Sequence, residues 1–309
     1  MGGGFRYSDD NKRYHTLNYH NRQVYGGRVF KAAINAGFSC PNIDGSKGRG
    51  GCIYCGGGSG YFSHGGLSVS EQIERERSRI HEKYPEAKIT AYFQANSNTY
   101  APAGYLRRLF EEAISCVLCG IAAATRADCI DGEKARLLAE LPVPVTVELG
   151  LQTVHDSTAR AINRCHSFAE FLEGYSLLKR FGVRVCVHII NGLPGEDEGM
   201  MLETARILGR LRPEGVKIHS LHVIEGTLLH EMFERGEYTP IGKQEYINIA
   251  VRQLELLPPE TVIERLTGDG DKKTLTAPLW SADKISVLGG IDKRMEQLDT
   301  VQGRYFTEE

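Results

Sequence analysis

The sequence predicts an α/β protein, a partial (β/α)6 barrel followed by a C-terminal extension. Six short β-rich runs alternate with amphipathic helical runs from residue 28 onward, which is typical of a parallel sheet with helical crossovers. The chain has 309 residues, of which 41% are hydrophobic, so it can bury one large core. No internal repeat or low-complexity linker marks a second domain.

The predicted strands are residues 29–35, 88–94, 120–125, 143–151, 183–190 and 215–222. Capping boxes indicate helix starts at Ser68 and Ser167, and Asp131 fits the N-cap of a helix over 132–141. The run 105–119 has the apolar face of a helix that covers a sheet. Six units are fewer than the eight of a complete barrel. In either an open or a closed parallel sheet, the functional site lies at the carboxyl ends of the strands.

The alternation stops after the sixth strand. Helices are predicted over 227–235 and 243–257, then a last strand over 262–266 and a closing segment over 283–305. We therefore divide the chain into an N-terminal arm (1–27), a barrel core (28–225) and a C-terminal extension packed on the barrel (226–309).

Composition restricts the location and the partners. The start of the chain lacks the apolar run of a signal peptide and no stretch is long enough to span a membrane, so we expect a cytoplasmic protein without a membrane partner. A formal net charge of −2 gives no overall attraction to nucleic acid, so a polyanion would need a local basic patch.

Such a patch is present in the N-terminal segment, residues 5–31, which interleaves six aromatic rings with six Lys or Arg residues against two Asp residues. Rings that stack on unpaired bases beside cations that meet phosphates are used to bind single-stranded RNA. The alternative is that these rings pack across one end of the domain.

A glycine-rich loop carries three cysteines, Cys40, Cys52 and Cys55. Three thiolates can hold three corners of an iron–sulfur cubane and leave the fourth iron open to another ligand. The rival is a zinc site that joins Cys52 and Cys55 to Cys116 and Cys119. Sixty residues separate the two pairs, which disfavours a compact zinc site, but the thiolates alone leave both metals open.

Several motifs together resemble the radical S-adenosylmethionine (SAM) superfamily. They are the cysteine loop, Leu149-Gly-Leu-Gln152, Asn163-Arg-Cys-His166 and the run from His188 through Gly192-Leu-Pro-Gly to Glu196. The resemblance is to the branch of the Elongator catalytic subunit and the oxygen-independent coproporphyrinogen oxidase, and above all to the bacterial YhcC-like group. Eleven residues separate Cys40 from Cys52, more than in the commonest signature, and such a long loop resembles the Elongator branch.

The resemblance implies that Cys40, Cys52 and Cys55 ligate a 4Fe-4S cluster and that SAM binds the open iron. It places Tyr54 near the adenine, Gln152 on the ribose hydroxyls and Arg164 on the carboxylate, roles that suit an amide and a planar guanidinium. The other cofactor contacts it suggests are Gln94, Asn96, Thr125, Glu148, His188 and Gly192.

Each of these contacts has a structural alternative. Glu148 can instead pair with an inward arginine such as Arg126, and His188 can be a hydrogen-bonded core residue. Arg164 taken alone resembles a surface arginine, and Gly192 can simply turn a strand into a helix.

The function implied is reductive cleavage of SAM to a 5′-deoxyadenosyl radical, with an electron from a flavodoxin- or ferredoxin-type donor. The substrate implied is transfer RNA (tRNA), modified on the C5 side chain of the wobble uridine, for instance by conversion of a carboxymethylaminomethyl to an aminomethyl group. Two alternatives stay open. One is radical chemistry on a small metabolite or tetrapyrrole, and the other is a non-enzymatic iron–sulfur or zinc protein that binds RNA.

Overall fold

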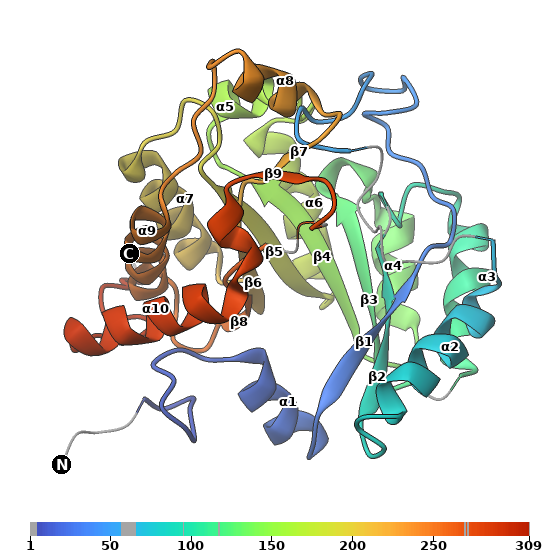
Figure 1. Cartoon of the computed structure of the whole chain (residues 1–309). Coiled ribbons are helices and arrows are strands. Elements are labelled where there is room, and N and C mark those ends of the chain that lie inside the picture. Colours follow the sequence, from blue (N-terminus) through green and yellow to red (C-terminus); the bar gives the residue numbers. More distant parts are fainter. Residues whose placement is uncertain are drawn as a thin grey trace.

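The computed structural model describes residues 5–56, 66–94, 96–116, 118–268, 270 and 272–308. Within them seven parallel strands form one sheet in the order β1-β2-β3-β4-β5-β6-β8, which curls into a partial barrel (Figure 1). The strands are β1 (Val29–Ile34), β2 (Lys88–Phe93), β3 (Gly120–Arg126), β4 (Val145–Gln152), β5 (Arg184–Asn191), β6 (Gly215–Ser220) and β8 (Val262–Arg265). All six predicted barrel strands are present, each with ends shifted by no more than two residues.

A seventh strand extends the predicted six-unit barrel. β8 was expected only as a strand of the C-terminal tail, but it pairs in parallel with β6 and so belongs to the barrel sheet. β1 and β8 are thereby the two edges of the sheet. A salt bridge of 2.8 Å between Lys31 of β1 and Glu264 of β8 joins these edges across the lumen.

Helices cover the outer face of the sheet. They include α2 (Val69–His81), α3 (Ala103–Ile114), α4 (Gly132–Glu140), α6 (Phe168–Arg180), α7 (Glu198–Leu211) and α9 (Lys243–Leu256). Helix α10 (Lys284–Gln297) packs against α9, and the short helix α5 (Asp156–Ala161) lies near the carboxyl ends of the strands (Figure 1). Capping boxes at Ser68 and Ser167 and the cap at Asp131 begin α2, α6 and α4 as predicted. A described two-stranded sheet of β7 (Val223–Ile224) and β9 (Leu275–Ala277), with helix α8 (Leu228–Glu234), lies near the carboxyl ends of the barrel strands (Figure 1).

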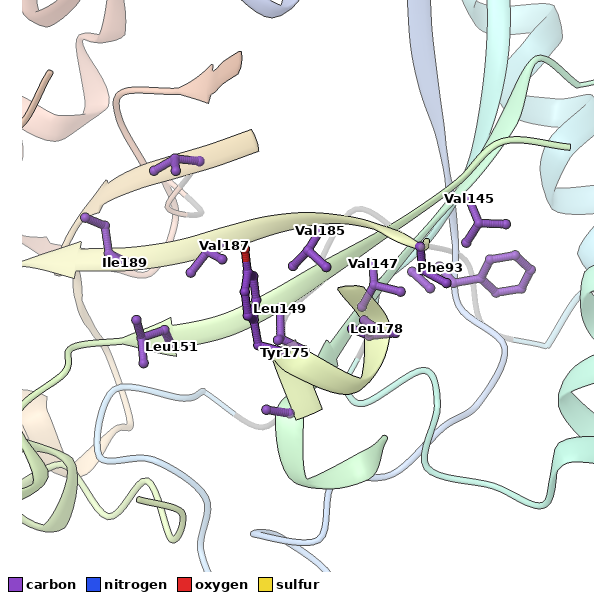
Figure 2. Close-up of a cluster of buried hydrophobic side chains, with 14 of the residues drawn as sticks. Phe93, Val145, Val147, Leu149, Leu151, Tyr175, Leu178, Val185, Val187 and Ile189 are labelled. Atoms are coloured by element: carbon purple, nitrogen blue, oxygen red, sulfur yellow. The ribbon is translucent and has the colours of Figure 1, made fainter. Parts of the chain in front are cut away.

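Alternation along the strands separates core from lumen. In β4 and β5 the apolar residues alternate with the others and pack against Tyr175 and Leu178 of α6 (Figure 2). The outward set is Val145, Val147, Leu149, Leu151, Val185, Val187 and Ile189, all buried. Their neighbours in sequence, Glu148 and His188 among them, therefore point into the lumen.

The N-terminal arm closes the amino end of the barrel. Helix α1 (Leu17–Tyr25) leads directly into β1, and Thr16 pairs with Ile263 beside β8. The aromatic rings of the arm are used in packing: Tyr14 is buried and Tyr7 stacks on His15 with 4.7 Å between ring centroids. The arm lies at the end of the barrel opposite the loop that follows β1. Its aromatic rings are therefore explained by packing across one end of the domain, the alternative to binding RNA.

A cavity of about 940 Å³ lies between the arm and α10, and none of its lining residues was predicted for the site. In the described part of the chain, no helix is long and apolar enough to cross a membrane.

Candidate functional site

The cysteine loop leaves the carboxyl end of β1, on the face where a parallel sheet carries its site. Its turns are closed by backbone hydrogen bonds from Ile43 and Asp44 to the carbonyl of Cys40 and from Cys55 to that of Cys52. Gly51 has a φ of +75°, a conformation that favours glycine at the bend just before Cys52. The glycine run after Cys55 lies largely outside the described residues.

The loop is fastened to the turn after α5. The amide of Asn163 donates to the carbonyls of Gly51 at 2.7 Å and Arg49 at 3.2 Å. In the other direction, the amide of Asn42 donates to the carbonyl of Asn163 at 2.5 Å and reaches the Cys52 Sγ at 3.7 Å. Asn163 adopts a φ of +53°, which Asn tolerates better than most residues. The position of Cys52 is therefore coupled to the turn that carries Arg164.

A buried ion pair also contacts the turn that carries Arg164. Arg126, at the end of β3, donates to the carbonyls of Arg164 at 2.9 Å and Cys165 at 3.3 Å, and pairs with Asp128 at 2.7 Å. Burial alone would raise the pKa of Asp128, but the hydrogen bonds and charge of Arg126 outweigh it and lower this pKa to about 2. Lys47 of the cysteine loop lies 3.0 Å from the same carboxylate. Arg126 thus pairs with Asp128, which excludes it as the partner of Glu148.

Polar atoms without a protein partner gather beside this turn. The Arg164 guanidinium donates through Nη2 to the carbonyl of Gly150 at 2.7 Å, while its Nε and the Oε1 of Gln152 are buried and unpartnered. A Cβ on Gly150 would meet Arg164 Nη2 and Gln152 Nε2, each at 2.9 Å, so this glycine leaves room for the ends of the two side chains to converge. Buried polar atoms normally have partners, so this pair is suited to a polar ligand.

Tyr54 belongs to the same group of residues. Burial raises the pKa of its hydroxyl well above the ordinary value, and the nearby Cys52 adds to the rise while Arg164 opposes it. The ring therefore lies close to both Cys52 and Arg164. The structure thus gathers the loop cysteines, Tyr54, Gln152 and Arg164 at one end of the barrel.

The alternative zinc site is not formed. Cys119 directly precedes β3 and contacts the carbonyl of Ile89 at 3.3 Å, so it lies at the amino end of the sheet, opposite the cysteine loop. The Sγ of Cys116 contacts the carbonyl oxygen of Glu112, in the last turn of α3. Among the described residues, no three His, Cys, Asp or Glu side chains are placed to hold a single metal ion.

Three other predicted residues have internal partners. The amide of Asn96 donates to the carbonyl of Phe38 at 2.8 Å, and the hydroxyl of Thr125 lies 2.6 Å from that of Thr99. Thr125 also has the strand parity of Ile121 and Ala123, which face the outer core rather than the lumen. Gly192 donates its N–H to the sulfur of Met201 and accepts from the Tyr238 hydroxyl at 2.8 Å. These contacts engage the amide of Asn96, the hydroxyl of Thr125 and the backbone of Gly192 within the protein, and the cofactor role of these residues stays a prediction. Gln94, in contrast, is buried with its Nε2 unpartnered.

Glu148 is the centre of a charged network in the lumen. It accepts hydrogen bonds from Lys31 of β1, Lys217 of β6 and the Tyr92 hydroxyl of β2, the last at 2.7 Å. Burial opposes the charge of Glu148, but the two ammonium groups outweigh it and hold its pKa well below the ordinary value. The carboxylate is therefore ionised, and its partners are lysines rather than an arginine.

His188 lies next to this network. Its Nε2 is 3.0 Å from Glu148 Oε2, yet the contact lacks hydrogen-bond geometry. Burial, and then the charge of Lys217, lower the pKa of His188, so the ring is neutral at physiological pH.

The sequence reasoning missed Asn42, Lys217 and Glu264. It named Asn163 only as part of the motif that carries Arg164, and it counted Lys31 only among the cations of the N-terminal segment. A lone charge inside an apolar strand run is visible at Lys31 and Lys217 and could have predicted inward-facing ions. Asparagines in irregular segments give no comparable signal.

Comparison with known families agrees with this geometry. Residues 44–208 match the family model described as the Radical SAM superfamily. The chain belongs to this superfamily. Residues 213–297 match the Radical_SAM C-terminal domain. Membership implies a 4Fe-4S cluster and SAM as cofactors, which confirms the two cofactors predicted from the sequence.

Individual relatives confirm the predicted resemblance. The chain is 44% identical to YtqA of Bacillus subtilis (strain 168), covering 98% of this chain and 95% of that protein. It is 33% identical to YhcC of Escherichia coli (strain K12), covering 88% and 89%. A shorter match, 33% identity over 40% of this chain and 23% of the relative, is to a tRNA uridine(34) acetyltransferase of Methanocaldococcus jannaschii.

Among solved structures, the archaeal Elp3 of Methanocaldococcus infernus has a similar fold. The TM-score is 0.69 with 18% identity, and the match covers 89% of this chain and 64% of that one. This similarity confirms the partial radical SAM barrel with a C-terminal extension.

Proposed function

We propose that the chain is a radical SAM enzyme in which Cys40, Cys52 and Cys55 hold the 4Fe-4S cluster. The observation that carries this proposal is the pair of unpartnered buried atoms, Gln152 Oε1 and Arg164 Nε, beside the fastened cysteine loop. A loop with three cysteine thiolates, next to buried polar atoms that have no hydrogen-bond partner, fits a cluster with a polar cofactor bound to it.

We assign roles to the surrounding residues from their polar groups and from the chemistry of their side chains. Arg164 would hold the carboxylate of SAM, Gln152 its ribose hydroxyls, and Tyr54 would pack near its adenine. Gln94 directly follows β2, and its carbonyl oxygen would accept a hydrogen bond from the amino group of SAM. The cofactors supply a 5′-deoxyadenosyl radical when an electron arrives from a flavodoxin- or ferredoxin-type donor, and the protein positions them and excludes water.

The proposed substrate is tRNA, modified on the C5 side chain of the wobble uridine. Support comes from the match to a tRNA uridine(34) acetyltransferase, which covers 40% of this chain. The reaction we propose converts a carboxymethylaminomethyl to an aminomethyl group. Loss of a hydrogen atom from the carboxymethyl carbon and return of one electron, which offsets the electron that the donor supplied, would give an imine of the substrate. Water would then break its bond between nitrogen and the carboxymethyl carbon. SAM is thus the net two-electron oxidant: SAM, water and the modified nucleoside give 5′-deoxyadenosine, methionine, the aminomethyl nucleoside and glyoxylate. A cytoplasmic location, where tRNA is available, belongs to the same proposal.

Two experiments test the proposal. Protein reconstituted anaerobically should hold about four irons and four sulfides per chain and, once reduced, form 5′-deoxyadenosine from SAM. Bound zinc without this product would refute the radical chemistry.

The substrate is tested by nucleoside analysis of tRNA from a deletion strain. The carboxymethylaminomethyl nucleoside should accumulate there and be converted, with release of glyoxylate, by the purified enzyme. Unchanged wobble uridines in the deletion strain would refute the substrate and leave the radical chemistry intact.

A further inference from the structure

His188 of β5 has no role in the steps described above. Its Nε2 is buried 3.0 Å from Oε2 of the ionised Glu148. Its Nδ1 is not one of the buried atoms that lack a partner, and it makes no hydrogen bond with the described residues. The side chain keeps 18% of its surface exposed, so Nδ1 belongs to this exposed part. The ring therefore presents one nitrogen to a carboxylate and the other to the lumen.

The position of His188 in the sheet connects the ion network to the proposed cofactor site. His188 pairs in register with Gly150 of β4, whose carbonyl oxygen accepts from Arg164. Glu148 pairs with Cys186 instead, two residues nearer the amino end of β5. Paired residues of neighbouring strands share a face of the sheet, and the site lies where the strands end. Within the lumen, His188 is thus one inward position nearer the cofactor residues than Glu148.

The charges around the ring leave it neutral and able to accept a proton. Burial and then the charge of Lys217 lower the pKa of His188, while Glu148 and Glu264 oppose this. A proton accepted at Nδ1 would make the ring a cation 3.0 Å from the Glu148 carboxylate, which stabilises that charge. The groups that surround the ring are Glu148 of β4, Lys217 and His219 of β6, Lys31 of β1, Tyr92 of β2, and Glu264 and Arg265 of β8. A neutral imidazole next to a carboxylate is suited to act as a general base.

The proposed reaction needs such a base. The secondary amine of the carboxymethylaminomethyl group is an ammonium ion at neutral pH. Loss of a hydrogen atom and an electron from the carboxymethyl carbon gives an imine only if the nitrogen also loses a proton. The nitrogen lone pair stabilises a radical on that carbon, so loss of the hydrogen atom makes the ammonium group more acidic. A neutral imidazole is then a strong enough acceptor for the proton.

We propose that His188 is the general base that removes a proton from the secondary ammonium group of the substrate. This proposal rests on the proposed function, because the amine beside the reacting carbon belongs to that substrate. The hydrogen atom goes to the 5′-deoxyadenosyl radical, the electron returns to offset the one that the donor supplied, and the proton goes to Nδ1. The protonated imine that remains is the species that water cleaves. Glu148 is a positioning residue, which holds the ring and stabilises its charge.

The test compares two anticodon stem-loops on the reconstituted, reduced enzyme between about pH 6.5 and 8. One carries carboxymethylaminomethyluridine, and the other has oxygen in place of the amine nitrogen, so its radical step releases no proton. With the wild-type protein, glyoxylate release from the amine should change less than about 3-fold over this range. A rise of about tenfold per pH unit would mean that the enzyme uses amine already deprotonated in solution. That result overturns the proposal without any variant.

Variants then assign the base. His188→Gln should convert the amine at least about 100-fold more slowly than the wild type near pH 7, and the oxygen analogue within about 3-fold of it. Its rate on the amine should recover about tenfold per pH unit as free amine becomes more abundant. Binding of the amine stem-loop to the unreduced variant, measured by fluorescence anisotropy, should stay within about 3-fold of the wild type, because Gln also accepts a hydrogen bond. His230→Gln should behave as the wild type, because His230 lies on α8 with its ring 3.8 Å from Glu234 of the same helix.

The outcomes separate the base from the proposed function. Equal slowing of both substrates in His188→Gln, an unchanged amine rate, or a rate that does not recover with pH refutes the base and leaves the proposed function intact. A wild type that cleaves SAM but releases glyoxylate from neither substrate refutes the proposed function, and the assigned base with it. Each variant should retain about four irons per chain. If His188→Gln does not, the wild-type pH profile decides.

Discussion

Replacing Asn163 by alanine should weaken the docking of the cysteine loop against the turn after α5 by about 3 kcal/mol. Two hydrogen bonds, to the carbonyls of Gly51 and Arg49, would be lost at about 1 kcal/mol each. Alanine at a φ of +53° would add roughly 1 kcal/mol of backbone strain. Asn163→Gly removes only the hydrogen bonds, so it should cost about 2 kcal/mol, a shift of roughly 30-fold between docked and undocked loop.

The assay is the iron retained by the reconstituted protein after gel filtration, followed over time. Iron should be lost fastest from Asn163→Ala, more slowly from Asn163→Gly and slowest from the wild type. Asp299→Ala is the matched control, since Asp299 also has a positive φ, of 44°, but pairs only with Arg13 at the surface. The reasoning is refuted if Asn163→Ala retains iron as the wild type does, or if the Asp299 control loses it equally.

Three further outcomes follow from the site. Cys55→Ala should abolish formation of 5′-deoxyadenosine from SAM while Cys119→Ala leaves it intact, because only Cys55 lies at the carboxyl end of the sheet; equal losses contradict this. Glu148→Gln should lower the free energy of unfolding in urea by about 3 kcal/mol, because the buried ammonium group of Lys217 loses its anion while the half-buried Lys31 keeps Glu264, and a loss below about 1 kcal/mol argues against the network. The pKa of His166 is lowered from 6.5 to about 3, by burial first and then by Arg164, so its stabilisation is full above pH 6.5 and is lost as the pH falls toward 3. Going from pH 7 to pH 5 should therefore remove about 2 kcal/mol through His166, and urea unfolding of the cluster-free protein should show a smaller loss in His166→Gln.

The sequence predicted most of the fold because strand signals are local. Each of the six barrel strands is a short apolar or alternating run between turn signals, and the structure moves its ends by two residues at most. β8 was assigned to the tail because α8 and α9 separate it from β6. Whether such a strand joins the sheet depends on pairing across the gap, which no local pattern encodes.

The site was predictable where chain order determines position. The cysteine loop follows β1, so its place at the carboxyl end of the sheet follows from a parallel topology. For Asn96 and Thr125 the residue types suited a cofactor, but residue type does not reveal the hydrogen bonds that they make with Phe38 and Thr99. The clamp between Asn42 and Asn163 spans 121 residues and depends on side-chain geometry that spacing does not reveal.

The ion network of the lumen also sets the order in which the protein can fold. Lys31 meets Glu264 across 233 residues of chain, so this contact cannot form until nearly the whole protein has left the ribosome. Until then Lys31 has only Glu148 as a carboxylate partner among the described residues, and β1 is an edge strand of the sheet both before and after this contact forms. The ion network of the lumen is therefore complete only once the C-terminal region that carries β8 has joined the sheet.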